Sequence, residues 1–186
     1  MNPIKNKKDL EIKIDEIKNF AHAYLKKYSS SKQKLRTYLF KKFLKKNQKI
    51  FNKKEIFNLI DAAISTLADQ KLISDKYYSD VKTKAFLRRG YSLNKIRYSL
   101  IKKGIDEKYI KVSISKIKEN ESDPDFFSAI KICKRRRIGP CREESNRSLF
   151  YKKDISILAR SGFSYEISKK VLEIPKEEFN KFCKMI

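Results

Sequence analysis

The candidate binding side chains in this sequence are cationic, and they recur in short clusters. Arginine and lysine donate hydrogen bonds to carboxylates and phosphates, and arginine does so with a planar fork of donors. We predict a contact stripe made of Lys34, Arg36, Lys41, Lys42, Arg88, Arg89, Lys95, Arg97, Lys102, Lys103, Arg135, Arg136 and Arg137. For each of them, a solvated helix surface is the alternative interpretation.

The other reactive side chains form no catalytic or metal-binding pattern. His22 is the single histidine, and the three cysteines form no CxxC pair with zinc spacing. Cys133 is expected to pack in a core. For Cys141, an exposed thiol whose pKa nearby cations lower is one interpretation, and a redox role is left open. No phosphate-binding glycine loop occurs. We therefore expect no enzymatic activity, no cofactor and no metal.

Four tyrosines raise the question of base stacking, because aromatic rings bind single-stranded nucleic acid in this way. They are Tyr77, Tyr78, Tyr91 and Tyr98. All four lie at helical spacing next to apolar residues, which favours packing in or beside a core.

The net charge limits the class of partner. The chain has 186 residues, and 46 Lys and Arg against 22 Asp and Glu give a formal charge of +24. The excess is spread along the whole chain, which favours a polyanion or an acidic protein as partner. An AT-rich genome would explain the excess of lysine over arginine, but not the shortage of acidic residues. The first residues lack the apolar stretch of a signal peptide, and no apolar run is long enough for a membrane span, so we expect a cytoplasmic protein.

The sequence pattern predicts that these residues lie on helices. Apolar side chains recur at helical spacing, and capping residues and glycines mark the ends. Predicted helices run from Asp15 to Lys27, through residues 32–43 and 53–71, from Asp75, Ser92, Asp106 and Asp123, from Tyr151 to Arg160, and from Ser164 and Pro175. Asn52 and Glu55 form a variant of the capping box, Asp75 and Asp106 are expected to cap helices, and residues 141–149 are expected to be a polar loop.

The predicted helices fall into a repeat of three. Residues 34–42 match residues 95–103, Ser31 falls in register with Ser92, and Gly104 matches Gly162. We predict an all-α fold of three tandem three-helix repeats that stack into an elongated, curved solenoid. The predicted divisions are an N-terminal extension (1–19), repeat 1 (20–74), repeat 2 (75–122), and repeat 3 with a C-terminal helix (123–186).

One part of the sequence resembles a known family. Residues 72–79, 87–92 and 96–106 are similar to the centre of the RecX family, with the pattern L-x-D-D-x-x-[FY]-A, then R-x-x-[RK]-G, then I-x-x-x-L-x-x-K-G-[IV]. The chain keeps Asp75, Tyr78, Gly90 and Gly104 of this pattern. It departs with Lys71 where glycine is common, Ser74 for the first Asp and Ser79 for Ala. Residues 129–140 and 154–167 resemble the family's third repeat, so the resemblance covers about residues 20–173.

The resemblance implies a non-enzymatic regulator of the RecA recombinase. RecX-like proteins bind RecA filaments on single-stranded DNA and suppress ATP hydrolysis and strand exchange, which modulates DNA repair, recombination and the SOS response. They fit along the filament groove or cap its growing end, and the sequence does not choose between the two. The expected partners are the RecA filament and single-stranded DNA, with double-stranded DNA left open, and a monomer is expected. The alternative is a general nucleic-acid-binding helical protein without a dedicated RecA partner.

Overall fold

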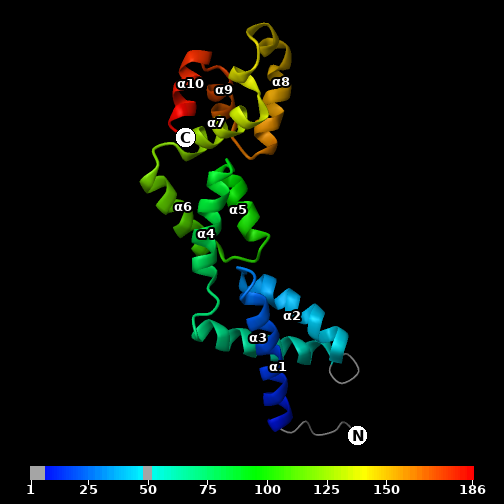
Figure 1. Cartoon of the computed structure of the whole chain (residues 1–186). Coiled ribbons are helices and arrows are strands. Elements are labelled where there is room, and N and C mark those ends of the chain that lie inside the picture. The colour runs from blue at the N-terminus through cyan, green and yellow to red at the C-terminus, as the bar shows by residue number, and fades with distance from the viewer. Residues whose placement is uncertain (1–6, 48–51) are drawn as a thin grey trace. The chain divides into compact units, whose positions relative to one another are not determined.

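Every regular element in the computed structural model of the protein is a helix (Figure 1). The structure describes residues 7–47 and 52–186, and no strand occurs among them. The elements are α1 (Lys7–Leu25), α2 (Lys32–Asn47), α3 (Lys53–Asp69), α4 (Asp75–Arg88), α5 (Leu93–Ile101), α6 (Glu107–Asn120), α7 (Pro124–Arg136), the short 3-10 helix η1 (Gly139–Cys141), α8 (Glu144–Arg160), α9 (Tyr165–Leu172) and α10 (Lys176–Lys184). The predicted all-α class is confirmed. Within the described chain, none of the helices combines the length and the apolar character that a bilayer crossing demands.

The chain divides into two compact units. The N-terminal unit comprises the chain up to Tyr78 together with Lys103–Asp106, and the C-terminal unit comprises Ser79–Lys102 and Glu107–Ile186. The division into three repeats, and their stacking into a solenoid, stay predictions.

The core of the N-terminal unit is built from the apolar stripes of α1, α2 and α3. The buried side chains at the helical spacing seen in the sequence are Ile17, Ala21, Leu35, Leu39, Phe43, Ile56, Ile60, Ala63, Ile64 and Leu67. Leu59 and Ile73 are also buried in this core, although they were not predicted. Helix α1 begins at Lys7 and not at Asp15, because the apolar spacing continues upstream through Ile14. Helix α3 begins with the predicted capping box, in which Asn52 and Glu55 each accept the other's backbone N–H, at 2.9 and 3.0 Å.

The core of the C-terminal unit gathers around α7. It includes Phe126, Ala129, Ile130, Cys133, Leu158, Val171, Leu172 and Phe179. The prediction of a polar loop over residues 141–149 is wrong, because η1 covers Gly139–Cys141 and α8 begins at Glu144. Asp154 fastens this segment: its carboxylate accepts the N–H of Gly139 at 2.9 Å and two hydrogen bonds from Arg142.

The serines that fall in register in the sequence make the same hydrogen bonds in the structure. Ser31 caps α2 by accepting the N–H of Lys34, and its hydroxyl donates to the carbonyl oxygen of Lys103 at 2.6 Å. Ser92 caps α5 in the same way, and its hydroxyl donates to the carbonyl oxygen of Ser161 at 3.0 Å. Each capping serine therefore also binds the turn between two helices that are distant in the sequence. These shared hydrogen bonds give a physical basis for the similarity between the segments that begin at Ser31 and Ser92.

The residue after each of these serines makes a second matching bond. The N–H of Lys32 donates to Asp75 at 2.9 Å, and the N–H of Leu93 donates to Asp125 at 2.7 Å. The prediction that Asp75 caps its own helix is wrong. Ser74 accepts the N–H of Tyr77 and caps α4, so the carboxylate of Asp75 is left to bind the first turn of α2.

Candidate nucleic-acid and partner interface

The basic residues predicted as a contact stripe differ in what they touch within the fold. The guanidinium of Arg36 binds other residues of the same unit. Its Nε and Nη2 donate to the two carboxylate oxygens of Asp61, at 2.6 and 2.7 Å, and its guanidinium lies 4.4 Å from the centre of the Phe57 ring. These hydrogen bonds raise the pKa of Arg36 because they stabilise its charged form. Arg36 therefore joins α2 to α3, and a partner would have to displace Asp61 to reach it.

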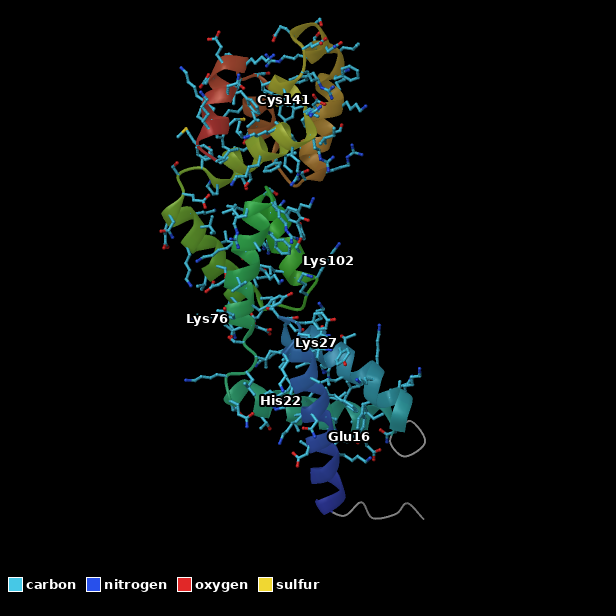
Figure 2. The ribbon with its side chains drawn as sticks, in the orientation of Figure 1. Glu16, His22, Lys27, Lys76, Lys102 and Cys141 are labelled. Carbon is cyan, nitrogen blue, oxygen red and sulfur yellow. The ribbon has the colours of Figure 1, made fainter. Side chains whose placement is uncertain are left out.

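Two predicted contact residues on α5 also have neighbours in the C-terminal unit. The Nε of Arg97 donates to Glu107 at 2.7 Å, and the ammonium of Lys95 lies 4.7 Å from the centre of the Tyr91 ring. Lys102, at the end of α5, is exposed (Figure 2), as are Lys34, Lys41 and Lys42 on α2. Lys103 is half-buried, and its carbonyl oxygen is held by Ser31.

The structure brings together two arginine groups that are distant in the sequence. The Nη1 of Arg135, on α7, donates to the carbonyl oxygen of Arg89 at 2.9 Å, where α4 has just ended. We call the residues around this contact the arginine cluster, defined as Arg88, Arg89, Arg135, Arg136 and Arg137. All five are exposed. They lie at the C-terminal ends of α4 and α7, where the helix dipole favours cations.

A tight turn holds the α4 side of this cluster in place. Gly90 has a φ of +76°, its N–H donates to Leu87, and the N–H of Tyr91 donates to Phe86. This is a Schellman ending, and the stacked rings of Phe86 and Tyr91, 5.1 Å apart, supply its apolar contact. A Cβ at Gly90 would lie 3.1 Å from the carbonyl oxygen of Ser128 on α7, so the turn packs closely against α7, the helix that carries Arg135.

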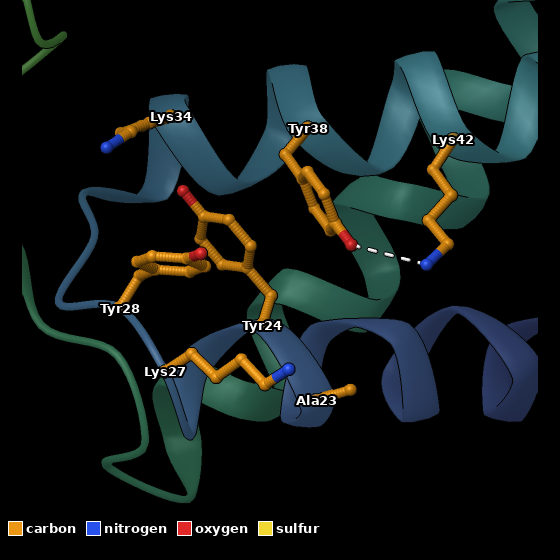
Figure 3. A pocket seen from close by; sticks show the side chains of 7 residues that line it. All are labelled: Ala23, Tyr24, Lys27, Tyr28, Lys34, Tyr38 and Lys42. Carbon is orange, nitrogen blue, oxygen red and sulfur yellow. Dashed lines mark hydrogen bonds between the residues drawn. The ribbon is translucent and has the colours of Figure 1, made fainter.

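A second feature lies in the N-terminal unit, between α1 and α2 (Figure 3). It is a pocket of about 610 Å³, lined by Ala23, Tyr24, Lys27, Tyr28, Lys34, Tyr38 and Lys42. Lys34 and Lys42 are predicted contact residues, but Lys27 and the three tyrosines were not predicted as site residues. Their spacing in the sequence indicates that they share a surface, because residues four apart lie on one face of a helix. Tyr24 and Tyr28 are four residues apart, and Lys34, Tyr38 and Lys42 follow one another at the same interval.

The cysteines occupy apolar surroundings in the C-terminal unit. Cys133 is fully buried, as predicted. Cys141 is only half-buried (Figure 2), and burial raises the pKa of its thiol, an effect that outweighs the opposing influence of Lys176 and Lys134. The interpretation of Cys141 as an exposed thiol with a lowered pKa is therefore wrong. Cys183 also packs at the edge of this core, and burial raises its pKa as well.

The four tyrosines considered for stacking divide into two pairs. Tyr78 is buried, which raises the pKa of its hydroxyl, and Tyr91 stacks on Phe86, so these two pack as predicted. Tyr77 and Tyr98 are exposed, so the prediction of core or boundary packing does not hold for them.

The chain is similar in sequence and in fold to proteins named RecX. No protein-family model matches the chain. A protein of Myxococcus xanthus named Regulatory protein RecX is 27% identical over 161 residues, 84% of each chain. A protein of the same name from Clostridium perfringens (strain SM101 / Type A) is 26% identical over 168 residues, 89% of this chain and 76% of that one. The crystal structure of RecX from Lactobacillus salivarius has a TM-score of 0.60 and 18% identity, covering 90% of this chain and 97% of the other.

The predicted resemblance to RecX proteins is confirmed. The agreement with several RecX proteins over most of their length confirms the resemblance seen in the sequence. The crystal structure adds that the helical fold of this chain is shared with that protein at 18% identity.

Proposed function

We propose that this RecX-like chain is a non-enzymatic negative regulator of RecA. It binds RecA filaments on single-stranded DNA and inhibits their ATP hydrolysis and strand exchange, and so modulates DNA repair and recombination in the cytoplasm. The observation that carries the proposal is the similarity to proteins named Regulatory protein RecX over more than four fifths of the chain. The protein acts as a monomer, and its other ligand is single-stranded DNA.

The arginine cluster is the part of the C-terminal unit best suited to contact the filament. A filament on DNA offers both protein carboxylates and phosphates, and the arginine fork binds either with two parallel hydrogen bonds. In the cluster, the Arg135 hydrogen bond to Arg89 holds two short basic segments beside each other. A preorganised group of cations loses less side-chain entropy on binding than separate mobile ones do.

One observation favours the second candidate, a general nucleic-acid-binding protein. The charge of +24 would attract any polyanion without a dedicated protein partner. Such a protein would bind many DNA forms with similar affinity, and its binding would fall steeply with salt concentration.

The deciding experiment is a titration of the single-stranded-DNA-dependent ATPase of the cognate RecA, at about 0.15 M salt. Inhibition well below one copy per RecA protomer supports the regulator and favours capping of filament ends. Inhibition that appears only when the DNA is saturated, and that extra DNA or salt relieves equally well, supports the second candidate.

A pair of matched variants tests the arginine cluster. Arg88→Glu combined with Arg136→Glu reverses two exposed charges while sparing Arg135, which makes the structural hydrogen bond. Lys152→Glu combined with Lys169→Glu makes the same change of net charge at exposed positions elsewhere in the C-terminal unit. We expect half-inhibition by the arginine variant to require at least about tenfold more protein. Truncating one partner of a charge pair that is buried in a complex costs about 2–5 kcal/mol. Equal inhibition by both variants would remove the cluster from the proposal.

A further inference from the structure

The pocket between α1 and α2 presents a group of aromatic rings. The rings of Tyr24 and Tyr38 stack with centres 4.2 Å apart and an angle of 27°, and Tyr28 lies 5.1 Å from Tyr24. Tyr24 and Tyr38 pack against the core of the N-terminal unit, whereas Tyr28 lies outside that core with 55% of its surface exposed. The rings of Tyr24 and Tyr38 are therefore supported by the core, and the ring of Tyr28 is accessible to a ligand (Figure 3).

The remaining long side chains that line the pocket are cationic. Lys27 follows the last turn of α1, and Lys34 and Lys42 lie on α2. No acidic residue lines the pocket. The ammonium of Lys42 lies 3.4 Å from the hydroxyl of Tyr38 and 4.7 Å from the centre of the Phe20 ring, which fixes one positive charge at the edge of the aromatic group.

This combination fits a strand of unpaired bases. A base stacks on an aromatic ring, and its phosphates bind neighbouring lysines. In a duplex the faces of the bases are already stacked on one another, so a duplex cannot use the rings. A free nucleotide is too small: Lys34 and Lys42 are eight residues apart, which is about 12 Å along a helix. Phosphates at both lysines therefore require a strand.

We propose that this pocket is a single-stranded DNA site, in which a base stacks on Tyr28 while Lys27, Lys34 and Lys42 bind the phosphates beside it. The stacking of bases follows from the rings and charges alone, and the choice of DNA over RNA rests on the proposed function.

The test measures binding of a fluorescent oligothymidylate of about twelve nucleotides, a length within the usual range for such sites, by anisotropy. Tyr28→Leu removes the ring but keeps an apolar side chain, and Tyr28→Phe keeps the ring. Tyr165→Leu is the matched control, because Tyr165 is 64% exposed and lies in the C-terminal unit. We expect Tyr28→Leu to weaken binding about tenfold, within the range for loss of one stacked base. Tyr28→Phe and Tyr165→Leu should bind as the unchanged protein does, and circular dichroism checks that all of them are folded.

An oligonucleotide of the same length with abasic positions separates stacking from charge. The unchanged protein should bind it about tenfold more weakly than oligothymidylate, and Tyr28→Leu should bind both equally. Lys27→Gln should instead lower the salt dependence of binding, by about 0.7 in the logarithmic slope. Equal binding of both oligonucleotides by the unchanged protein would overturn the proposal, as would a loss in Tyr165→Leu as large as that in Tyr28→Leu.

Two further ligands test the identity of the occupant. Thymidine monophosphate at millimolar concentration should not displace the oligonucleotide, and displacement would overturn the assignment to a strand. An oligouridylate of the same length should bind more weakly than the DNA; tighter binding that depends equally on Tyr28 would overturn the assignment to DNA.

The failure of this site and the failure of the proposed function are distinguishable. If the protein inhibits RecA but its DNA binding is independent of Tyr28, the pocket proposal alone is wrong. If its DNA binding depends on Tyr28 but RecA is unaffected at about 0.15 M salt, the regulator proposal is wrong and the stacking site stands.

Discussion

The most direct test of the structure is the removal of Asp154. Its side chain is 1% exposed, and it binds Arg142 with two hydrogen bonds of 2.7 and 2.8 Å as well as the N–H of Gly139. Asp154→Ala would leave the Arg142 guanidinium, whose side chain is only 20% exposed, without its counter-charge, and would leave the buried N–H of Gly139 without an acceptor. Removing one partner of a buried ion pair costs about 3–5 kcal/mol.

A second ion pair with the same geometry provides the control. Arg36 and Asp61 form two hydrogen bonds of 2.6 and 2.7 Å, but their side chains are 34% and 50% exposed. Asp61→Ala is also a change in the middle of a helix, so both variants gain the same helix propensity. Because water solvates the remaining charge, we expect Asp61→Ala to cost about 1 kcal/mol or less. The two variants differ in burial and in the third hydrogen bond, which Asp154 accepts from the N–H of Gly139.

The free energy of unfolding is measured by urea denaturation followed by circular dichroism. A loss of about 4 kcal/mol in Asp154→Ala would be a large part of the roughly 5–15 kcal/mol typical of a folded domain. Hydrogen exchange should show that protection is lost in η1 and the first turns of α8. If Asp154→Ala costs no more than Asp61→Ala, then burial does not govern the strength of these pairs, and the account of how α8 is fastened is wrong.

Three further predictions follow from local geometry. Lys71 has a φ of +59° after the end of α3, so Lys71→Gly should raise the free energy of unfolding by about 0.5–1 kcal/mol in urea denaturation, whereas Lys71→Ala should not. Ser92→Ala should cost about 2 kcal/mol in the same assay and Ser164→Ala about 1 kcal/mol, because Ser92 also binds a distant carbonyl while Ser164 only caps α9. Burial and its hydrogen bond to Glu173 raise the pKa of Tyr151 to about 12, so unfolding releases a proton between pH 10 and about pH 12. Urea denaturation across that interval should show a smaller loss of stability with rising pH in Tyr151→Phe than in the unchanged protein.

The features that the sequence predicted correctly are those that neighbouring residues determine. Helical stripes depend on side chains three and four positions apart, and caps depend on residues within one turn. The capping box at Asn52 and the caps at Ser92 and Asp123 form as predicted for this reason. The register of Ser31 with Ser92 also carried information, since both make the same long-range hydrogen bond.

The features that the sequence did not reveal depend on distant partners. Residues 141–149 are polar, and nothing near them indicates that Asp154 fastens their first turn. Arg147 is similar, because its Nη2 donates to the carbonyl oxygens of Leu172 and Ile174, which lie more than twenty positions away. The pocket between α1 and α2 was not predicted, because Tyr24 and Tyr38 lie at the spacing of the apolar stripes of their helices.

The structure shows that several of the few arginines in this chain stabilise the fold. Ten arginines occur among the 46 basic residues, and an arginine cluster in such a sequence suggests function. Several of the ten serve the fold instead, since Arg36, Arg97 and Arg142 bind carboxylates, and Arg147 binds backbone carbonyls. Arginine suits these positions because its fork satisfies two acceptors at once.

Most of the exposed arginines lie together, and the two exposed arginines elsewhere, Arg97 and Arg160, bind Glu107 and the carbonyl oxygen of Ser156. Arg88, Arg89, Arg136 and Arg137 are exposed at the ends of α4 and α7, which the Arg135 hydrogen bond joins. A genome that favours lysine would replace arginine wherever a point charge is enough. These positions keep the planar fork on the surface, where it is accessible to an acceptor outside the chain. The arginine cluster is for that reason a stronger candidate for the filament contact than the more numerous exposed lysines.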